Sequence, residues 1–328
     1  MGKPSARPAV SGDPEKVLIG TRGSQLALYQ AGSIKTQLEH LYSGLKVELV
    51  KIKTTGDKIT DVPLAKVGGK GLFVKEIEEA LLRGEIDLAV HSMKDVPVTL
   101  PAGLHLSAIT RREDPRDVLI SRKAKSFRDL PQGGILGTSS LRRQAQLRHL
   151  RPDLRIQPLR GNLDTRLRKL DEGAMAAIVL AAAGVKRLGW EDRITEYLDP
   201  SVSLPAIGQG ALGLECRVED ARINALLAPL NHADSSRCVR AERAFLMRLS
   251  GGCQVPIAAH ARLEGEEILL DGLVAGVEGE RVIRDRIRGH WTKGEAMGIE
   301  LAERLLSKGA AAILNEIDQA GANEPAPP

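Results

Sequence analysis

The chain has 328 residues, more than a single hydrophobic core usually organises, so we expect two or three domains. Hydrophobic residues make up 42% and charged residues 27%, as in globular proteins, and no run of 18 apolar residues predicts a membrane span. Aromatic residues are only 2% and the net charge is a modest +5, which argues against a nucleic-acid partner bound by base stacking or by a strongly basic surface.

The cysteines are Cys216, Cys238 and Cys253. An odd number with no CxxC pair argues against a disulfide framework and a four-cysteine zinc site, so we expect no metal. The same pattern is typical of a reducing compartment. Residues 1–14 lack the apolar stretch of a secretory signal, which predicts a cytoplasmic protein with a disordered N-terminal extension.

The first ~110 residues alternate between strand and helix patterns, an order typical of a parallel α/β sheet. The predicted strands are Val17–Gly20, Leu45–Lys53 and Ile86–His91, and the predicted helices are Gln25–Leu41 and Val74–Arg83. The glycine-rich segment Gly68–Gly71 lacks the spacing of a phosphate-binding P-loop, so we interpret it as a lid or hinge.

The alternation restarts after Asp114-Pro115 and predicts a second α/β lobe. Its strands are Ile135–Gly137, Leu154–Leu159 and Ala176–Leu180, and its helices are Leu141–Leu150 and Asn162–Leu170. Thr138, Ser139 and Ser140 offer N-terminal caps for the first of these helices.

From about Cys238 the pattern changes to a helix followed by strands that Glu-Gly turns connect, which predicts an antiparallel sheet. The strands are Ala258–Leu263, Ile268–Ala275 and Arg281–Gly289, and the helices are Val239–Leu249, Glu295–Leu306 and Ala310–Ile317. Residues 319–328 are polar and rich in proline and are predicted to be a disordered tail.

Basic and hydroxyl side chains gather where predicted strands pass into helices. They are Arg22, Ser24, Ser139, Ser140, Arg142, Arg143, Arg160 and Arg166. Helix N-termini attract anions, and ligands of open α/β sheets bind at the carboxyl ends of the strands. The whole set predicts a cleft for a polyanion between two lobes, although any one arginine would fit a solvated helix face equally well.

The segment His91–Pro97 follows a buried strand and is a second candidate for chemistry. Lys94 and Asp95 could form a surface ion pair, or Asp95 could be a buried acid whose pKa its basic neighbours tune. His91 alone fits a hydrogen-bonded structural residue better than a catalyst.

A third candidate is Cys253, which stands in a Gly-Gly turn before an extended Val-Pro and is therefore expected to be accessible. Cys216 and Cys238 fit small buried residues instead.

Seven segments resemble the porphobilinogen deaminase family and occur in that family's order. They are Thr21–Ala27, Val67–Lys75 (VGGKGLFVK), Ala89–Pro97 (AVHSMKDVP), Gly137–Gln144 (GTSSLRRQ), Arg160–Arg166 (RGNLDTR), Pro205–Ala211 (PAIGQGA) and Glu242–Pro256 (ERAFLMRLSGGCQVP). Each is weak alone, but HSMKDVP, TSSLRRQ and the Gly-Gly-Cys segment are highly specific together.

The resemblance implies an α/β fold of three domains. Two are periplasmic-binding-protein-like lobes with mixed, mainly parallel sheets, and the third is a small α+β C-terminal domain with a three-stranded antiparallel sheet. The implied boundaries are residues 15–112 with 211–228 for domain 1, 113–210 for domain 2 and 233–318 for domain 3.

The resemblance also implies a covalent dipyrromethane cofactor, bound by a thioether to Cys253, and a catalytic Asp95. The other implied cofactor-binding residues are Lys94, Thr138, Ser139, Ser140, Arg142, Arg143, Arg160, Arg166, Arg187 and Asp57. The implied substrate-binding residues are Arg22, Ser24, Lys70 and Phe73.

The implied enzyme is a monomeric transferase of heme biosynthesis. It condenses four porphobilinogen units head to tail with loss of ammonia and then hydrolyses the product to release hydroxymethylbilane. Each unit carries two carboxylates, whose charge an arginine-lined cleft would offset. The alternative is a two-lobed, non-catalytic module that binds anions or an effector, which would explain the lobes and the arginines but not the Gly-Gly-Cys segment.

Overall fold

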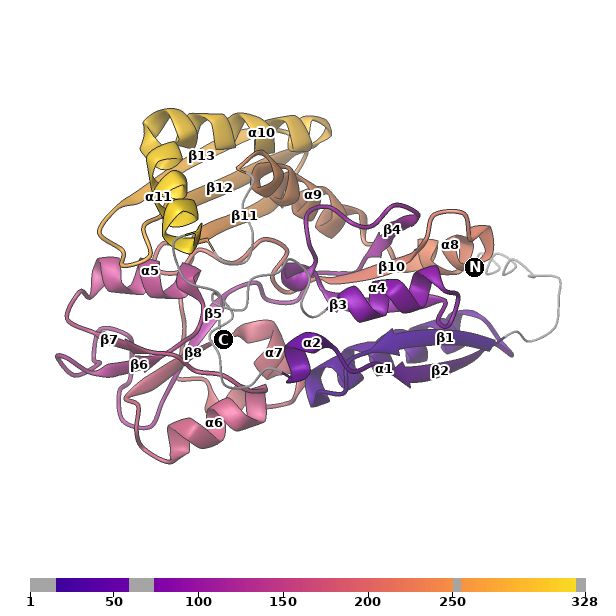
Figure 1. Ribbon diagram of the computed structural model, residues 1–328, viewed down its shortest axis with the longest axis horizontal. Coiled ribbons are helices and arrows are strands. Elements are labelled where there is room, and N and C mark those ends of the chain that lie inside the picture. The colour runs from indigo at the N-terminus through magenta and orange to yellow at the C-terminus, as the bar shows by residue number, and fades with distance from the viewer. Residues whose placement is uncertain (1–15, 59–73, 250–254, 323–328) are drawn as a thin grey trace, which may run out of the picture.

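The computed structural model describes residues 16–58, 74–249 and 255–322, which form three parts, each built on its own sheet (Figure 1). We call them the first lobe, which carries β1–β4 and β10, the second lobe, which carries β5–β9, and the C-terminal region, which carries β11–β13. Within these described ranges no helix is both long and apolar enough to span a membrane.

The first lobe has a five-stranded sheet in the order β2-β1-β3-β10-β4. Its strands are β1 (Lys16–Thr21), β2 (Lys46–Lys51), β3 (Leu88–Ser92), β4 (Leu104–Ile109) and β10 (Leu212–Arg217). Strand β1 runs parallel to β2 and β3, whereas β10 runs antiparallel to β3 and β4, so four strands point one way and β10 points the other.

Apolar helix faces cover both sides of this sheet. The helices are α1 (Gln25–Leu41), α2 (Thr55–Lys58), α4 (Lys75–Leu82), α8 (Ala221–Leu227) and the 3-10 turns η1 (Met93–Asp95) and η3 (Ala228–Leu230). Ile34 and Leu38 of α1 join Ile223 of α8 in one core, because residues three and four apart share a helix face. Ile77 and Leu81 of α4 join the core on the other side of the sheet.

The second lobe has a sheet in the order β7-β6-β8-β5-β9. Its elements are β5 (Asp117–Ser121), β6 (Ile135–Gly137), α5 (Leu141–Leu150), β7 (Arg155–Gln157), α6 (Leu163–Asp171), β8 (Ala177–Ala181), α7 (Ala182–Arg187), η2 (Glu191–Arg193) and β9 (Glu196–Tyr197). Only β5 opposes the other four strands, since it is antiparallel to β8 and β9 while β6 is parallel to β7 and β8.

The C-terminal region is an antiparallel sheet, β11-β12-β13, with helices packed on one face. Its elements are α9 (Ala233–Arg248), β11 (Ile257–Glu264), β12 (Glu267–Ala275), β13 (Val282–His290), η4 (Trp291–Lys293), α10 (Gly294–Leu305), η5 (Leu306–Ala310) and α11 (Ala311–Ala322). Ala258, Leu273 and Ala275 on the other face pack with Ala145 of α5, which joins this region to the second lobe.

The predicted fold class is confirmed: the lobes have mixed sheets with four of five strands aligned, and the third sheet has three antiparallel strands. The sequence patterns did not predict β4, β5, β9, β10, α2, α7 or α8. Strand β10 comes from beyond the second lobe yet lies between β3 and β4, so the chain crosses between the lobes twice.

The predicted start of the disordered tail at residue 319 is wrong, because α11 continues to Ala322. Ile313, Leu314 and Ile317 of this helix pack on the C-terminal core, which holds its last turns in place. The extension predicted for residues 1–14 lies outside the described residues.

Candidate active site

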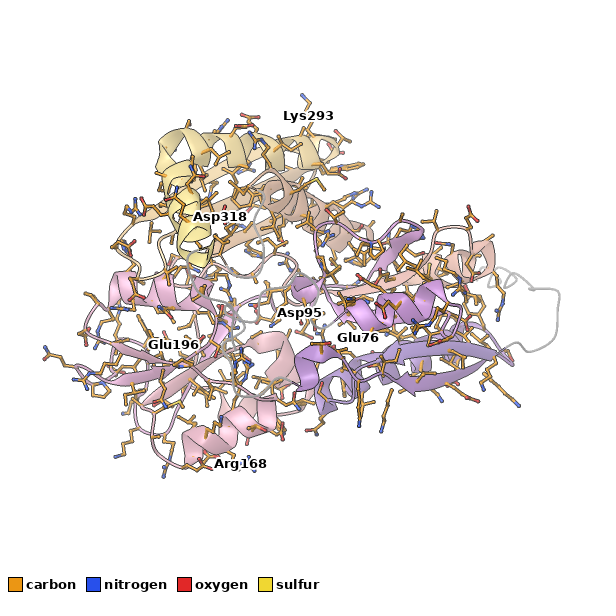
Figure 2. All side chains as sticks on the ribbon, viewed as in Figure 1. Glu76, Asp95, Arg168, Glu196, Lys293 and Asp318 are labelled. Atoms are coloured by element: carbon orange, nitrogen blue, oxygen red, sulfur yellow. The ribbon has the colours of Figure 1, made fainter. Side chains whose placement is uncertain are left out.

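Strand β3 carries the candidate catalytic residue to the junction of the three parts. The strand is buried, and Met93, only 1% exposed, fixes the turn that follows by donating its N–H to the Ala211 carbonyl at 3.0 Å. Asp95 is exposed at the centre of the molecule, where the lobes and the C-terminal region meet (Figure 2). The alternative that Asp95 is a buried acid is therefore wrong.

His91 has the structural role that the sequence favoured. Its Nε2 lies 2.8 Å from Glu215 Oε2 on the neighbouring strand β10, and both side chains are buried. This pair holds the middle of β3 against β10, four residues before Asp95.

Lys94 lies among charges from both lobes. Burial, together with the positive charges of Arg143 and Arg142, lowers the pKa of Lys94 to about 8, although the negative charges of Asp95 and Asp117 oppose the shift. At pH 7 Lys94 is still mostly protonated, so its ammonium adds to the positive potential of the junction.

Arg142 and Arg143, at the start of α5, share one fully buried carboxylate, that of Asp117. Arg142 donates to both oxygens of Asp117 at 2.8 and 3.2 Å, and Arg143 donates Nε and Nη2 to Oδ1 at 3.1 and 2.7 Å. Each arginine also donates one bond to a backbone carbonyl of the same lobe. Arg142 donates to the Leu204 carbonyl, and Arg143 donates to the Val179 carbonyl. These contacts hold the pKa of Asp117 far below its usual range, so the carboxylate is charged.

Sequence reasoning missed Asp117. The only local signal is a charged residue at the head of the apolar strand β5, which ordinarily marks a strand end. The ion pairs of Asp117 with Arg142 and Arg143 form only in the tertiary structure, and no repeating pattern in the sequence indicates them.

Thr138, Ser139 and Ser140 form the turn before α5, next to Arg142 and Arg143 in the chain. Thr138 is buried and accepts the Ser140 N–H at 3.1 Å, and the Ser139 hydroxyl donates to the Leu159 carbonyl at 3.0 Å. Ser140 occupies the N-cap position of α5, but its side chain makes no capping bond, so its predicted role as a side-chain cap is wrong.

Three further candidate arginines of the second lobe, Arg160, Arg166 and Arg187, are half-buried. Burial, together with the positive charges of Arg143 and Arg160, lowers the pKa of Arg166 to about 10. The negative charge of Asp95 opposes this shift, so Arg166 lies near the catalytic candidate. Arg187, at the end of α7, donates Nη2 to the Gly210 carbonyl at 2.6 Å on the segment that returns to the first lobe.

Arg22 and Ser24 follow the end of β1. Ser24 lies at the N-terminus of α1, as predicted, and it also caps this helix, since its hydroxyl accepts the Ala27 N–H at 3.3 Å. Arg22 is half-buried beside this cap.

Cys253, Lys70 and Phe73 lie outside the described residues, and so does the side chain of Asp57, whose backbone forms part of α2. Cys216 and Cys238 are buried free thiols, as predicted, and burial raises their pKa values to about 11 and about 12. Within the described ranges no three His, Cys, Asp or Glu side chains are grouped so that they could hold a metal ion.

Two arginines tie helix α9 to the junction, and neither contact was predicted. Arg243 donates to the carbonyls of Val96, Pro97 and Val98, directly after Asp95, at 3.3, 2.7 and 3.0 Å. Arg112, on the first crossing between the lobes, forms a buried bidentate pair with Glu242 at 2.5 and 3.2 Å. Helix α9 therefore fixes the position of the segment that follows Asp95.

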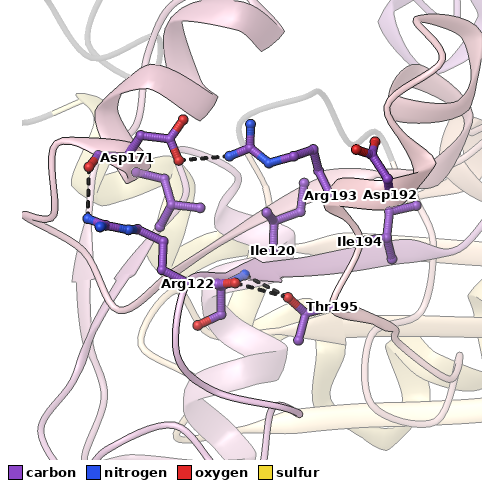
Figure 3. A pocket seen from close by; sticks show the side chains of 9 residues that line it. Ile120, Arg122, Asp171, Asp192, Arg193, Ile194 and Thr195 are labelled. Carbon is purple, nitrogen blue, oxygen red and sulfur yellow. Dashed lines mark hydrogen bonds and ion pairs between the residues drawn. The ribbon is translucent and has the colours of Figure 1, made fainter.

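A surface pocket of about 450 Å³ lies elsewhere in the second lobe, lined by Arg122, Asp171, Asp192, Arg193 and their neighbours (Figure 3). Arg193 already pairs with Asp171 at 2.7 Å, and Arg122 donates to the Asp171 carbonyl. The pocket includes none of the candidate site residues.

The junction thus gathers Lys94, Arg142, Arg143, Arg160 and Arg166 around two carboxylates, Asp95 and Asp117. Cations outnumber anions, and several of these side chains are shielded from water, which strengthens their attraction for an anion. The arrangement can bind a ligand with several carboxylates and place one carboxylate, Asp95, beside it.

Family models match most of the chain. "Porphobilinogen deaminase, dipyromethane cofactor binding domain" matches residues 17–225, and "Porphobilinogen deaminase, C-terminal domain" matches residues 236–307.

Relatives named porphobilinogen deaminase match over almost their full length. The protein from Geobacter metallireducens is 60% identical over 93% of this chain and 96% of its own, and that from Pelobacter propionicus is 60% identical over 93% and 98%. Among solved structures, a periplasmic domain of Bordetella pertussis BvgS overlaps 65% of this chain and 84% of its own with 16% identity and a TM-score of 0.39. The chain belongs to the porphobilinogen deaminase family.

Proposed function

We propose that the chain is a transferase that condenses four porphobilinogen units head to tail, with loss of ammonia, on a covalently bound dipyrromethane primer. Hydrolysis then releases the linear tetrapyrrole hydroxymethylbilane for heme biosynthesis. The observation that carries this proposal, beside family membership, is the cluster of positive charges at the junction of the two lobes. Lys94 and Arg166 interact with the charge of Asp95, and Arg143 interacts with both of them.

The residues of the junction fit a dipyrromethane, which carries four carboxylates. The guanidinium groups of Arg142 and Arg143 have five N–H donors each. Three donors of each group bond to described residues, and the other two have no acceptor among the described residues. Bidentate arginine–carboxylate bonds suit those donors. When bound, the group supplies the free pyrrole carbon that attacks the incoming substrate.

The proposed attachment point is Cys253, on the connection between α9 and β11. Helix α9 supports this placement, because Arg243 fastens it to the carbonyls that follow Asp95. Cys253 is ten residues beyond Arg243 in the chain, so a group attached to Cys253 would be anchored close in sequence to a residue that contacts the segment after Asp95.

The further ligands that we propose for the cofactor are Lys94, Thr138, Ser139, Ser140, Arg160, Arg166, Arg187 and Asp57, and those for the substrate are Arg22, Ser24, Lys70 and Phe73. Those with described side chains contribute hydroxyls or positive charge. Such groups bind and orient acetate and propionate arms, and the desolvated pairs are worth about 1.5–3 kcal/mol each.

Asp95 is the proposed catalytic residue. Departure of ammonia leaves positive charge on the substrate, and a fixed carboxylate stabilises that charge and can take a proton from a pyrrole nitrogen. Lys94 and Arg166 lie close enough to interact with the Asp95 charge, and their own positive charges can bind the substrate acids.

We assign residues 15–112 with 211–228 to domain 1, 113–210 to domain 2 and 233–318 to domain 3, and we propose a cytoplasmic monomer. The sheets support the division, since β10 joins the first sheet and β5–β9 form the second.

The test is to incubate the purified protein with porphobilinogen and to measure ammonia and tetrapyrrole together. The proposal predicts four ammonia molecules for each hydroxymethylbilane. Binding of porphobilinogen without release of ammonia would favour the non-catalytic module instead.

A further inference from the structure

Asp117 is the most highly coordinated carboxylate of the second lobe. It is 0% exposed and begins β5, directly after the first crossing between the lobes. Besides the four bonds from Arg142 and Arg143, it accepts the Ser203 hydroxyl at 2.7 Å and the Gln209 side-chain amide at 2.9 Å. Its two oxygens are fully used, so Asp117 itself has no capacity left for a ligand.

The charges of this cluster do not balance. Two guanidiniums share one carboxylate, which leaves one positive charge in a region where Arg142 and Arg143 are only 6% and 5% exposed. An unpaired buried charge is strongly destabilising, so the surplus needs an anion that the described part of the chain does not supply. By contrast, the buried Arg112–Glu242 pair has one charge of each sign, and backbone N–H groups of Gly208 and Ala261 complete it.

The surplus positive charge of the second lobe acts on Lys94 in the first lobe. The Lys94 ammonium responds to Arg142, Arg143 and Asp117 across the junction, and it precedes Asp95 in sequence. The unused donors of the two arginines therefore belong to the same junction as the catalytic carboxylate.

The bonds to Asp117 restrict how the two arginines can move. The Asp117 carboxylate accepts two N–H bonds from each guanidinium, and these bonds fix the orientation of both guanidinium planes. Each guanidinium keeps further N–H groups that do not bond to Asp117. We propose that Asp117 is a positioning residue, which holds Arg142 and Arg143 so that their remaining N–H groups converge on the carboxylates of the covalently bound primer. This inference rests on the proposed function.

The test is Asp117→Asn, which keeps the size of the side chain but removes its charge. The matched control is Asp271→Asn, because Asp271 is also buried and shared by arginines, Arg262 and Arg286, but in the sheet of the C-terminal region. For each folded protein we would measure the fraction that carries the two-pyrrole adduct by intact mass, together with kcat and KM for porphobilinogen.

Asp117→Asn is expected to reduce adduct loading or kcat by about 100-fold per folded molecule, the usual loss when binding groups move by about 1 Å. Asp271→Asn should load normally even if its Tm falls. Normal loading and normal kcat in folded Asp117→Asn would overturn the proposal.

If Asp117→Asn does not fold, Ser203→Ala decides the matter, because it removes one hydrogen bond to Asp117 and leaves all charges in place. A loss of about 3-fold or more in loading rate supports the proposal, as expected for one hydrogen bond, and an unchanged rate overturns it. Wild-type protein that never carries an adduct would instead refute the proposed function.

Discussion

Replacing Glu78 by glutamine is expected to stabilise the protein in alkaline solution and to have little effect in acid. Glu78 lies on α4, is 7% exposed, and its Oε1 is buried with no hydrogen-bond partner among the described residues. Burial, and then the negative charge of Glu215, raise the pKa of Glu78 from 4.5 to about 7, while His91 opposes the shift. The folded protein therefore holds this proton more tightly than the unfolded chain does.

The sign and the size of the effect follow from that difference. Below pH 4.5 both states carry the proton, so Glu78 has no pH-dependent effect; between pH 4.5 and 7 the unfolded chain ionises first, and the free energy of unfolding falls. Above pH 7 the loss is complete at about 3 kcal/mol, since a tenfold change in an ionisation constant is worth about 1.4 kcal/mol. Glutamine has no charge to bury, so Glu78→Gln should recover up to about 3 kcal/mol at pH 8.

The assay is thermal unfolding at pH 5 and pH 8. Glu78→Gln should raise Tm by about 6 °C at pH 8, at about 2 °C per kcal/mol, and by under about 2 °C at pH 5. Glu79→Gln is the control, because this neighbour on the same helix has a side chain that is 48% exposed. The reasoning is refuted if Glu78→Gln is no more stable than wild type at pH 8, or if it gains as much at pH 5.

Three further predictions concern the junction. Asp95→Asn should lower turnover by about 10²–10⁴-fold without changing Tm, because Asp95 is exposed and its proposed role is to act on the reacting groups; normal turnover would contradict that role. In wild type kcat/KM should fall above about pH 8 as Lys94 loses its charge, and Lys94→Arg should move that fall to higher pH, whereas an identical pH profile would exclude Lys94 as its source. Glu242→Gln should reduce the free energy of unfolding by about 3–5 kcal/mol, because it leaves Arg112 buried without its partner, and an unchanged denaturation midpoint would show that the pair contributes nothing.

Local patterns predicted the elements that depend on local signals. The apolar run of β3, the Ser24 cap of α1 and the helical patterns of α1 and α5 lie within short segments, so the strand-to-helix turns with Arg22, Ser24 and Ser140 were found. These turns place the site at the carboxyl ends of strands in two lobes.

Local patterns did not predict features that depend on distant segments, although the family resemblance implied that residues 211–228 belong to domain 1. Strand β10 enters the first sheet from more than 100 residues beyond β3, and nothing in its sequence specifies its neighbours. As a charged residue, Glu78 is expected on the polar face of helix α4, yet the fold buries its side chain near Glu215. The sharing of Asp117 by Arg142 and Arg143 likewise requires β5 and α5 to be in place first.

The most direct measurement is peptide mass spectrometry of the protein purified from cells that make porphobilinogen. A primer held in the cationic junction beside Asp95 predicts that the peptide with Cys253 carries the mass of two linked pyrroles, and that the peptides with the buried Cys216 and Cys238 are unmodified. An unmodified Cys253 in protein that still makes the tetrapyrrole would contradict the thiol-anchored primer.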